Sequence, residues 1–412
     1  MALPSPAAAA AAEQSKRPPF EVADVVRGYA ADFLRAHPSS GQQRSVLRAI
    51  RRCRTAELGG HVEGCDSCGH KRIAYNSCRN RHCSKCQGKE RARWMAAEQA
   101  MLLPVPYFHV VFTLPHALNP LIRLNRDLLL GLLFRTAART LGAFALDPRH
   151  LGGEPALTMV LHTWGQTLGE HYHVHCVVSG GGLSVDGRSW ISLPAGKKKR
   201  RRPFLFPVRA LSRLFCKKYI SALRRARKRG ALRYHGESAA LAGPVPWEKL
   251  LAGLEATHWV VYSKPPFGGP AQVLKYLSRY THRVAISNRR ILFVGNGMVR
   301  FEYRDYADGY KRKELPLAAT EFLRRFLLHV LPKGFMRIRH YGITANRHRQ
   351  AKLARCRELL ATSAPPNPAV TTATPDPNQA PHHPDRQGAA CPLCGAPLRI
   401  IELLAPSPFD SS

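Results

Sequence analysis

The chain of 412 residues is long enough for two or three domains, and its 63 lysines and arginines against 27 aspartates and glutamates give a net charge of +36. Such an excess of positive charge recruits polyanions through counterion release, so nucleic acid is the expected partner. The sequence has no run of 18 or more apolar residues, which argues against a membrane span. Its Ala-rich start also lacks the basic segment of a signal peptide.

The N-terminal part of the chain is expected to form a small domain behind a disordered start. Residues 1–18 are rich in Ala, Ser and Pro and are predicted to be disordered. Residues 19–100 are predicted to form a helical, zinc-binding domain that also binds DNA. Within it, the spacing of apolar residues predicts two short amphipathic helices over residues 20–54, joined at residues 38–41.

Two Cys-x-x-Cys pairs in this domain are separated by 14 residues. Each pair can form a tight turn that aims two thiolates at one tetrahedral ion, so the spacing predicts a structural zinc ribbon. The expected ligands are Cys65, Cys68, Cys83 and Cys86, with Cys78 and His82 competing within the cluster and His61, His70 and Cys53 available for a second ion. In a chain without a predicted signal peptide, this clustering fits zinc in a reducing cytoplasm better than disulfides. The many basic residues around the cysteine pairs suggest a module that binds DNA. The alternative is a zinc site with a purely structural role, whose surrounding charges are only solvated.

Residues 101–318 are expected to form a mixed α/β domain that contains a basic insertion at residues 184–246. Strands are expected at residues 107–114, 156–164, 170–179 and 258–262, helices at 125–144 and 208–229, and a three-stranded meander between 290 and 315, with a further helix at 320–331 just after this domain. The second and third strands are predicted to pair as an antiparallel hairpin in the middle of a sheet. The glycines that follow, Gly180–Gly182, would end the strand and allow the backbone or DNA to approach closely.

The third strand carries the motif His-Val-His. Side chains alternate along a strand, so His173 and His175 project from one face and can hold one divalent metal, which also needs a further ligand and open positions for substrate oxygens. Tyr276 and Tyr280 are spaced so that they lie one above the other on a predicted helix. A metal that polarises a phosphate beside an attacking phenol is the chemistry of a nuclease that joins covalently to DNA. Each motif alone has an ordinary interpretation, as surface histidines or as aromatic core packing.

Basic runs and a second cysteine pair complete the pattern. Phosphate contacts are expected from the uninterrupted run Lys197, Lys198, Lys199, Arg200, Arg201 and Arg202. Lys275 and Arg279 flank the tyrosines and are expected to hold phosphates or lower the phenol pKa, unless they are merely solvated. Residues 319–361 are predicted to be a basic helical segment, and residues 362–412 a linker and tail. That tail contains half a zinc site, Cys391 and Cys394, for which His382 and His383 are candidate partners.

Together these motifs resemble the transposases of rolling-circle insertion sequences, the IS91 family, within the HUH endonuclease superfamily. The resemblance covers residues 60–361. It is carried by the ribbon ending at Cys83, the strand Tyr107–His116, the histidine motif with its glycines, and the segment Tyr276–Asn288. It implies an α+β fold: an HUH-type catalytic domain with a central antiparallel sheet and a tyrosine-bearing helix, preceded by a small zinc-ribbon domain.

The same resemblance implies a role for each site residue. Tyr276 and Tyr280 would be the nucleophiles, and His173 and His175 would bind the catalytic metal. The third metal ligand is less fixed in the family. His162 is expected to supply it, because a hairpin neighbour of the histidine strand is held rigidly, and Gln166 and Gln272 are the alternatives.

The activity implied is transposition by metal-dependent cleavage and rejoining of single-stranded DNA through 5′-phosphotyrosine intermediates. Mg²⁺ or Mn²⁺ would be the catalytic cofactor and Zn²⁺ the structural one. The expected partners are single-stranded insertion-sequence ends and target sites, with host replication factors, in the bacterial cytoplasm and nucleoid. One alternative is a non-catalytic zinc-dependent DNA-binding protein, for which the charge and the ribbon suffice. Another is a hydrolytic metallonuclease, which needs carboxylates where only Glu170 is near.

Overall fold

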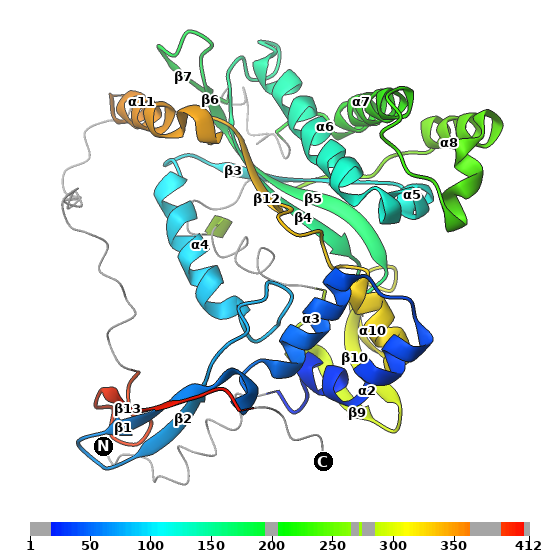
Figure 1. Ribbon diagram of the computed structural model, residues 1–412. Coiled ribbons are helices and arrows are strands. Elements are labelled where there is room, and N and C mark those ends of the chain that lie inside the picture. Colours follow the sequence, from blue (N-terminus) through cyan, green and yellow to red (C-terminus); the bar gives the residue numbers. More distant parts are fainter. Residues whose placement is uncertain (1–17, 194–204, 265–271, 274–284, 363–388, 408–412) are drawn as a thin grey trace. The chain divides into compact units, whose positions relative to one another are not determined.

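The computed structural model describes residues 18–193, 205–264, 272–273, 285–362 and 389–407 (Figure 1). The chain divides into two compact units, and each draws on separate stretches of sequence. The first comprises Met1–Gly88, Ile286–Val330 and Pro365–Ser412, and the second comprises Lys89–Ala285 and Leu331–Ala364. This division differs from the predicted domain boundaries, because the strands between residues 290 and 318 group with the N-terminal helices rather than with the histidine strand.

The second unit is built around a five-stranded sheet in which every neighbouring pair is antiparallel. In spatial order the strands are β12 (Ile338–Gly342), β4 (Ala156–Trp164), β5 (Glu170–Ser179), β3 (Tyr107–Thr113) and β8 (Val261–Lys264). The predicted hairpin in the middle of the sheet is therefore confirmed, and β5 is the central strand. The edge strand β12 lies in residues 319–361, which were predicted to be a basic helical segment; the strand was missed because its pairing partner lies far away in sequence.

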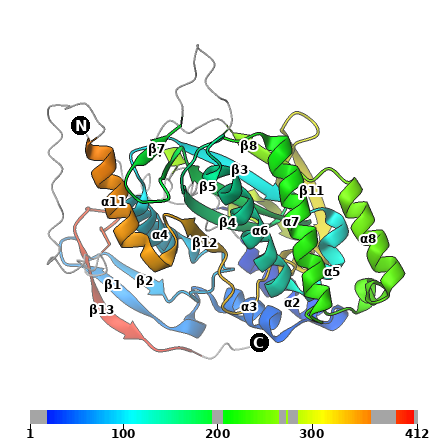
Figure 2. The same cartoon turned by 90° about the horizontal axis from the view of Figure 1, so that it is seen from above.

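One face of this sheet packs against the larger hydrophobic core. Tyr172, Val174, Cys176 and Val178 project from β5 into that core. Helices α6 (Arg126–Leu146), α7 (Val208–Lys228) and α8 (Pro244–Ala256) cover it (Figures 1 and 2). Among the described residues, α6 is the one helix long and apolar enough to cross a membrane. Most of its side chains are buried in this core, so its apolar character is explained by packing against the sheet.

Among the described residues, the opposite face of the sheet has a thinner hydrophobic covering. Val160 of β4 and Val177 of β5 belong to a smaller cluster there, together with side chains of α4 (Gln87–Met101) and α11 (Arg349–Thr362). Figure 1 shows α4 along the side of the sheet that faces away from α6. Because side chains alternate along β5, this thinner face is also the one from which its histidines project.

The first unit contains the two predicted N-terminal helices, α2 (Val22–Ala36) and α3 (Gly41–Arg52). Ser40 begins α3 with a capping box: its hydroxyl accepts a hydrogen bond from the Gln43 amide at 3.2 Å, and the Gln43 side chain accepts one from the Ser40 amide at 2.9 Å. The predicted meander is also confirmed. It consists of β9 (Ile291–Gly295), β10 (Met298–Asp305) and β11 (Lys311–Ala318) and is followed by α10 (Ala319–Leu327).

A second small sheet in this unit pairs two strands from the N-terminal part of the chain with one strand from its C-terminal part. Its order is β13 (Leu398–Leu404), β1 (Gly60–Cys65) and β2 (Lys71–Tyr75), and both pairs are antiparallel. Residues 362–412 were expected to form only a linker and tail. The described part of that stretch, residues 389–407, is instead folded onto β1, a pairing that local sequence patterns do not reveal.

The glycines after β5 are required by close packing of the chain against itself. A Cβ at Gly181 would lie 2.5 Å from the Trp190 ring, and one at Gly182 would lie 2.7 Å from the Gly153 backbone. Both distances are far below van der Waals contact. Of the two roles considered for these glycines, close approach of the backbone is the one for which the structure gives contacts.

The end of β12 generates a prediction about stability. Gly342 has a φ of +62°, and a Cβ there would lie 1.9 Å from the carbonyl oxygen of Pro155. Gly342→Ala is therefore expected to displace this edge strand and lower the free energy of unfolding by roughly 3 kcal/mol. Urea unfolding curves provide the measurement. In the control variant, Gly253→Ala in α8, nothing lies within 4 Å of the new Cβ, so a gain of up to about 1 kcal/mol is expected. Equal curves for the two variants would contradict this packing.

Candidate metal centre and cysteine clusters

Three histidines meet on the thinner face of the central sheet. His173 and His175 project from β5, and His162 of β4 lies directly opposite His173 in the antiparallel register. The three offer ligand nitrogens that all lie within 4.8 Å of one another. Each side chain is buried, with at most 8% of its residue surface exposed. Two neighbouring strands thus aim three imidazoles at one point.

A β-bulge lies next to this group. The register of β4 and β5 shifts between His162 and Trp164, and such bulges re-aim side chains beside functional sites. The rings of His162 and Trp164 stack at 4.7 Å with an interplanar angle of 22°. The indole therefore supports the imidazole of His162 from one side and restricts its rotation.

Hydrogen bonds orient the other two imidazoles. Nδ1 of His173 lies 2.8 Å from the carbonyl oxygen of His171, which accepts a hydrogen bond, so Nδ1 carries the proton and Nε2 keeps its lone pair. Nδ1 of His175 lies 2.9 Å from Nε2 of His109 on β3, and these two rings are parallel within 10°. Sequence reasoning missed His109. Its place in a predicted strand was the only available signal.

Burial keeps these imidazoles neutral. It lowers the pKa of His173 and His175 well below the ordinary value of 6.5, and the neighbouring His162 lowers both further. Burial likewise lowers the pKa of His109 to about 3, with smaller effects from Lys264 and His162. At neutral pH the histidines of β5 are therefore lone-pair donors suited to a metal ion, rather than cations suited to a phosphate.

Carboxylates do not join this group within the described part of the chain. Glu170, at the start of β5, is the nearest acid in sequence. Its carboxylate accepts hydrogen bonds from the Tyr172 hydroxyl at 2.6 Å and from the Arg123 guanidinium at 2.7 Å. Glu170 is thus engaged in an ion pair of its own. The donor set consists of three imidazoles, which leaves room for substrate oxygens around an ion.

The eight clustered cysteines form two separate groups, and the expected single site of Cys65, Cys68, Cys83 and Cys86 is wrong. One group is Cys53, Cys78, Cys83 and Cys86, and the other is Cys65, Cys68, Cys391 and Cys394. The physical reason is the hairpin of β1 and β2. Cys68 lies in its turn, whereas the chain reaches Cys78 only after β2 has run five residues, roughly 16 Å, toward the other end.

The group around Cys83 fits a structural zinc ion. Cys86 Sγ lies 3.4 Å from Cys53 Sγ and 3.6 Å from Cys78 Sγ, close to the edge of about 3.8 Å expected for a zinc–thiolate tetrahedron. Hydrogen bonds from Cys78 and Cys83 lower the pKa of the Cys53 thiol to about 7. His82, considered as a competing ligand, is buried outside this group, and its Nδ1 lies 3.2 Å from the side-chain oxygen of Asn80.

Comparison with known proteins identifies the family of the chain. A family model described as "Putative transposase" matches residues 156–352, and one described as "Transposase zinc-binding domain" matches residues 25–114. "Putative transposase y4qJ" of Sinorhizobium fredii is 51% identical over 346 residues, which cover 84% of this chain and 85% of the relative. "Transposase for insertion sequence element IS801" of Pseudomonas savastanoi is 31% identical over 322 residues, 77% of this chain and 74% of the relative. The chain belongs to the IS91 family of transposases. No solved structure matches it.

As a transposase the protein acts on DNA, and several residues expected to contact that DNA lie outside the described residues. They are Tyr276, Tyr280, Lys275, Arg279 and the run Lys197, Lys198, Lys199, Arg200, Arg201 and Arg202. Val273, three residues before Tyr276, is described and is fully buried in the cluster on the histidine face. Gln272, an alternative third ligand, is exposed, and Gln166 is partly buried in the loop between β4 and β5.

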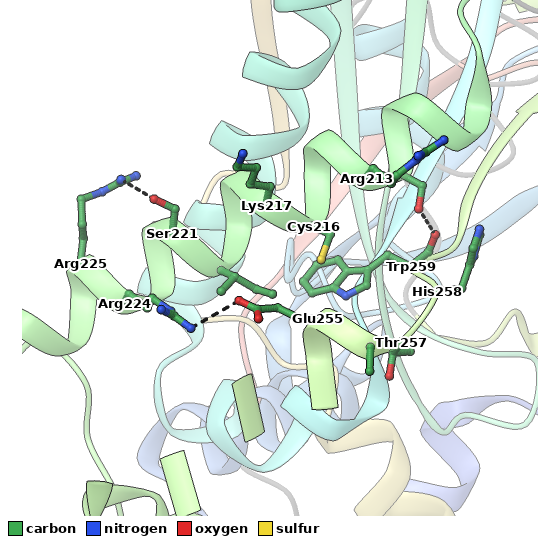
Figure 3. A pocket seen from close by; sticks show the side chains of 13 residues that line it. Arg213, Cys216, Lys217, Ser221, Arg224, Arg225, Glu255, Thr257, His258 and Trp259 are labelled. Atoms are coloured by element: carbon green, nitrogen blue, oxygen red, sulfur yellow. Dashed lines mark hydrogen bonds and ion pairs between the residues drawn. The ribbon is translucent and has the colours of Figure 1, made fainter. Parts of the chain in front are cut away.

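The transposase also has a cavity lined by described residues away from the histidines (Figure 3). Its volume is about 750 Å³, and it lies beside α7 and the segment that follows α8. Its floor is Trp259, a residue of the larger core on the opposite face of the sheet. Four basic residues line it, and one of them, Arg224, is paired with Glu255 at 3.3 Å. This cavity is therefore separate from the histidine site.

The depressed histidine pKa values predict how stability depends on pH. The folded transposase keeps His109 neutral down to a pH of about 3, whereas an unfolded histidine binds a proton below about 6.5. The unfolded state thus binds more protons between these values, and the free energy of unfolding falls as the pH falls through this window. Replacing His109 by Gln is expected to reduce this slope by up to about 1.4 kcal/mol per pH unit.

Urea unfolding of metal-free protein between pH 7 and pH 4.5 measures the slope. His258→Asn, which changes an exposed histidine outside the group, is the matched control and is expected to leave the slope unchanged. Equal slopes for the wild type and His109→Gln would show that His109 titrates alike in both states and would contradict its neutral, buried role.

Proposed function

We propose that this transposase cleaves and rejoins single-stranded DNA through 5′-phosphotyrosine intermediates, as an HUH-type endonuclease and strand transferase that mobilises an insertion sequence by rolling-circle transposition. One observation carries the proposal: His162, His173 and His175 lie within 4.8 Å of one another, buried and on adjacent central strands. Membership of the IS91 family and the antiparallel sheet with a central histidine strand support it.

The three imidazoles fit a divalent cation of the kind that acts on phosphates. The ion would supply Lewis-acid polarisation of the scissile phosphate and a template for its oxygens. Among the described residues the donor set contains no carboxylate, which suits Mn²⁺ better than Mg²⁺, because Mg²⁺ in proteins is usually held through carboxylates. His162 is proposed as the third ligand, ahead of the exposed Gln272, because the strand register fixes it opposite His173.

His109 is proposed to position His175. If Nδ1 of His175 donates its proton to Nε2 of His109 at 2.9 Å, Nε2 of His175 keeps the lone pair that a metal needs. Ligating histidines usually donate the other ring N–H in this way, which fixes the tautomer and the ring orientation. The carbonyl oxygen of His171 serves His173 in the same manner. His173 and His175 would thus each be aligned by one hydrogen-bond acceptor.

The proposed nucleophiles are Tyr276 and Tyr280. In the cleavage step one phenol loses its proton, its oxygen forms a bond to phosphorus, and the bond from phosphorus to the 3′-oxygen breaks. The 3′-oxygen takes up a proton and leaves as a free hydroxyl, so the linkage energy is retained for rejoining. The second phenol lets the same site cut another end. The buried Val273, three residues before Tyr276 and in the cluster on the histidine face, supports this assignment.

The competing function is DNA binding without chemistry. The charge of +36 and the cysteine groups would suffice for it. Three buried imidazoles favour the enzyme, and burial keeps His173 and His175 neutral, because a protein that only binds DNA gains nothing from burying neutral histidines. A hydrolytic metallonuclease is disfavoured, because Glu170 is paired with Arg123.

Replacing the tyrosines tests the proposed nucleophiles. Tyr276→Phe/Tyr280→Phe is expected to abolish the covalent adduct between protein and a labelled single-stranded oligonucleotide in Mn²⁺, because the attacking oxygen is missing. The adduct is detected as a protein-sized, SDS-resistant band. Tyr262→Phe, at an exposed tyrosine of β8, is the matched control and should retain the band. An undiminished band in the double variant would refute the nucleophile assignment.

Removing the positioning histidine tests the metal site through binding alone. His109→Ala is expected to weaken Mn²⁺ binding by about 10- to 100-fold, the usual effect of losing a partner of a ligating histidine. Isothermal titration calorimetry of the full-length wild type and of His109→Ala, both of which keep His173 and His175, measures this affinity. His173→Ala/His175→Ala should bind no Mn²⁺ at the site. An affinity for His109→Ala equal to that of the wild type would show that His109 does not orient His175.

A further inference from the structure

Four cysteines, two from the N-terminal part of the chain and two from its C-terminal part, come together around one point. Cys65 Sγ lies 3.4 Å from Cys394 Sγ, and Cys68 Sγ lies 3.6 Å from Cys391 Sγ. A disulfide would bring two sulfurs to about 2.05 Å, and all four are free thiols. The observed spacing is instead close to the edge of about 3.8 Å expected when four thiolates surround zinc.

Each of the two cysteine pairs lies in its own backbone turn, and the two turns are of the same type. In the first, the Gly69 amide donates a hydrogen bond to the Cys65 carbonyl oxygen at 2.9 Å. The Cys65 amide donates one to the carbonyl oxygen of the residue after Gly69, also at 2.9 Å. In the second, the Gly395 amide donates a hydrogen bond to the Cys391 carbonyl oxygen at 2.9 Å. The Cys391 amide donates one to the carbonyl oxygen of the residue after Gly395 at 2.7 Å. Both glycines have positive φ, +69° and +78°. The chain therefore forms the same thiolate-presenting turn twice, far apart in sequence, and the two turns face each other.

The sheet that carries these turns has almost no hydrophobic core. The buried cluster there consists of Cys65, Cys391 and Leu398. On β13, Ile400 is 60% exposed and Leu403 is 79% exposed. Three short strands with so little buried apolar surface are not expected to be stable without a staple. A tetrahedral metal would supply that staple, because binding to a folded site contributes directly to folding.

We propose that Cys65, Cys68, Cys391 and Cys394 form a second structural zinc site, which fastens the C-terminal strand β13 to β1. The protein then carries two structural zinc ions, one in each cysteine group. The matched zinc-binding domain ends at residue 114, so half of this site lies outside it. Four thiolates select zinc among the common divalent metals of the cell by their softness and geometry. The proposal does not depend on the catalytic mechanism.

Zinc content of the full-length protein tests the proposal. All variants are made in a His173→Ala/His175→Ala background, so that zinc cannot collect at the histidines, and are dialysed against metal-free buffer before elemental analysis. The background protein is expected to contain two zinc ions per chain. Cys391→Ser/Cys394→Ser is expected to contain one, and so is Cys78→Ser/Cys83→Ser. Cys216→Ser, which changes a cysteine outside both groups, is the control and should keep two.

An unchanged zinc content in Cys391→Ser/Cys394→Ser would overturn the proposal. Disulfides that link Cys65 or Cys68 to the C-terminal pair, found by mass spectrometry in place of the second ion, would also overturn it. If the double variant does not fold, single changes at the exposed Cys394 decide: Cys394→His keeps a zinc ligand and is expected to retain two ions, and Cys394→Ala is expected to retain one. Equal zinc contents for these two variants would count against the site.

Discussion

The site depends above all on the register in which β4 and β5 pair. That register sets His162 opposite His173, and the two-residue repeat of β5 adds His175 on the same face. A slip of one residue would turn His162 to the other face and separate the three imidazoles. The register itself is held by the larger core, because Tyr172, Val174 and Cys176 alternate with the histidines and are fully buried.

The two faces of the sheet divide structural and functional roles. The face beneath α6 and α7 is packed with apolar side chains, whereas the other face buries many polar groups in addition to the histidines. Glu98 of α4 lies there, and its carboxylate accepts a hydrogen bond from Thr158 at 3.3 Å and lies 3.4 Å from Nε2 of His340. Burial raises the pKa of Glu98 to about 7. Such buried polar groups cost stability, which the apolar face supplies, and a rigid scaffold of this kind holds site side chains in one geometry.

The cysteine groups follow a different logic, in which chain connectivity matters more than packing. The β1–β2 hairpin separates Cys68 from Cys78, so two pairs that look like one ribbon in sequence lie at opposite ends of it. The chain completes one group from Cys53 at the end of α3 and the other from the C-terminal Cys391 and Cys394. A metal ion bound by several thiolates holds together cysteines that are far apart in sequence, and its binding then contributes to folding.

Local and periodic features of this protein are fixed by sequence alone. The two N-terminal helices, the alternation that places His173 and His175 on one face, and the bounds of β4 and β5 all follow from residue spacing. Tertiary structure alone decided which distant segments meet: His109 beside His175, β12 beside β4, and the C-terminal cysteines beside Cys65 and Cys68. The reason is that periodicity reports which face of an element is buried, but not which other element buries it.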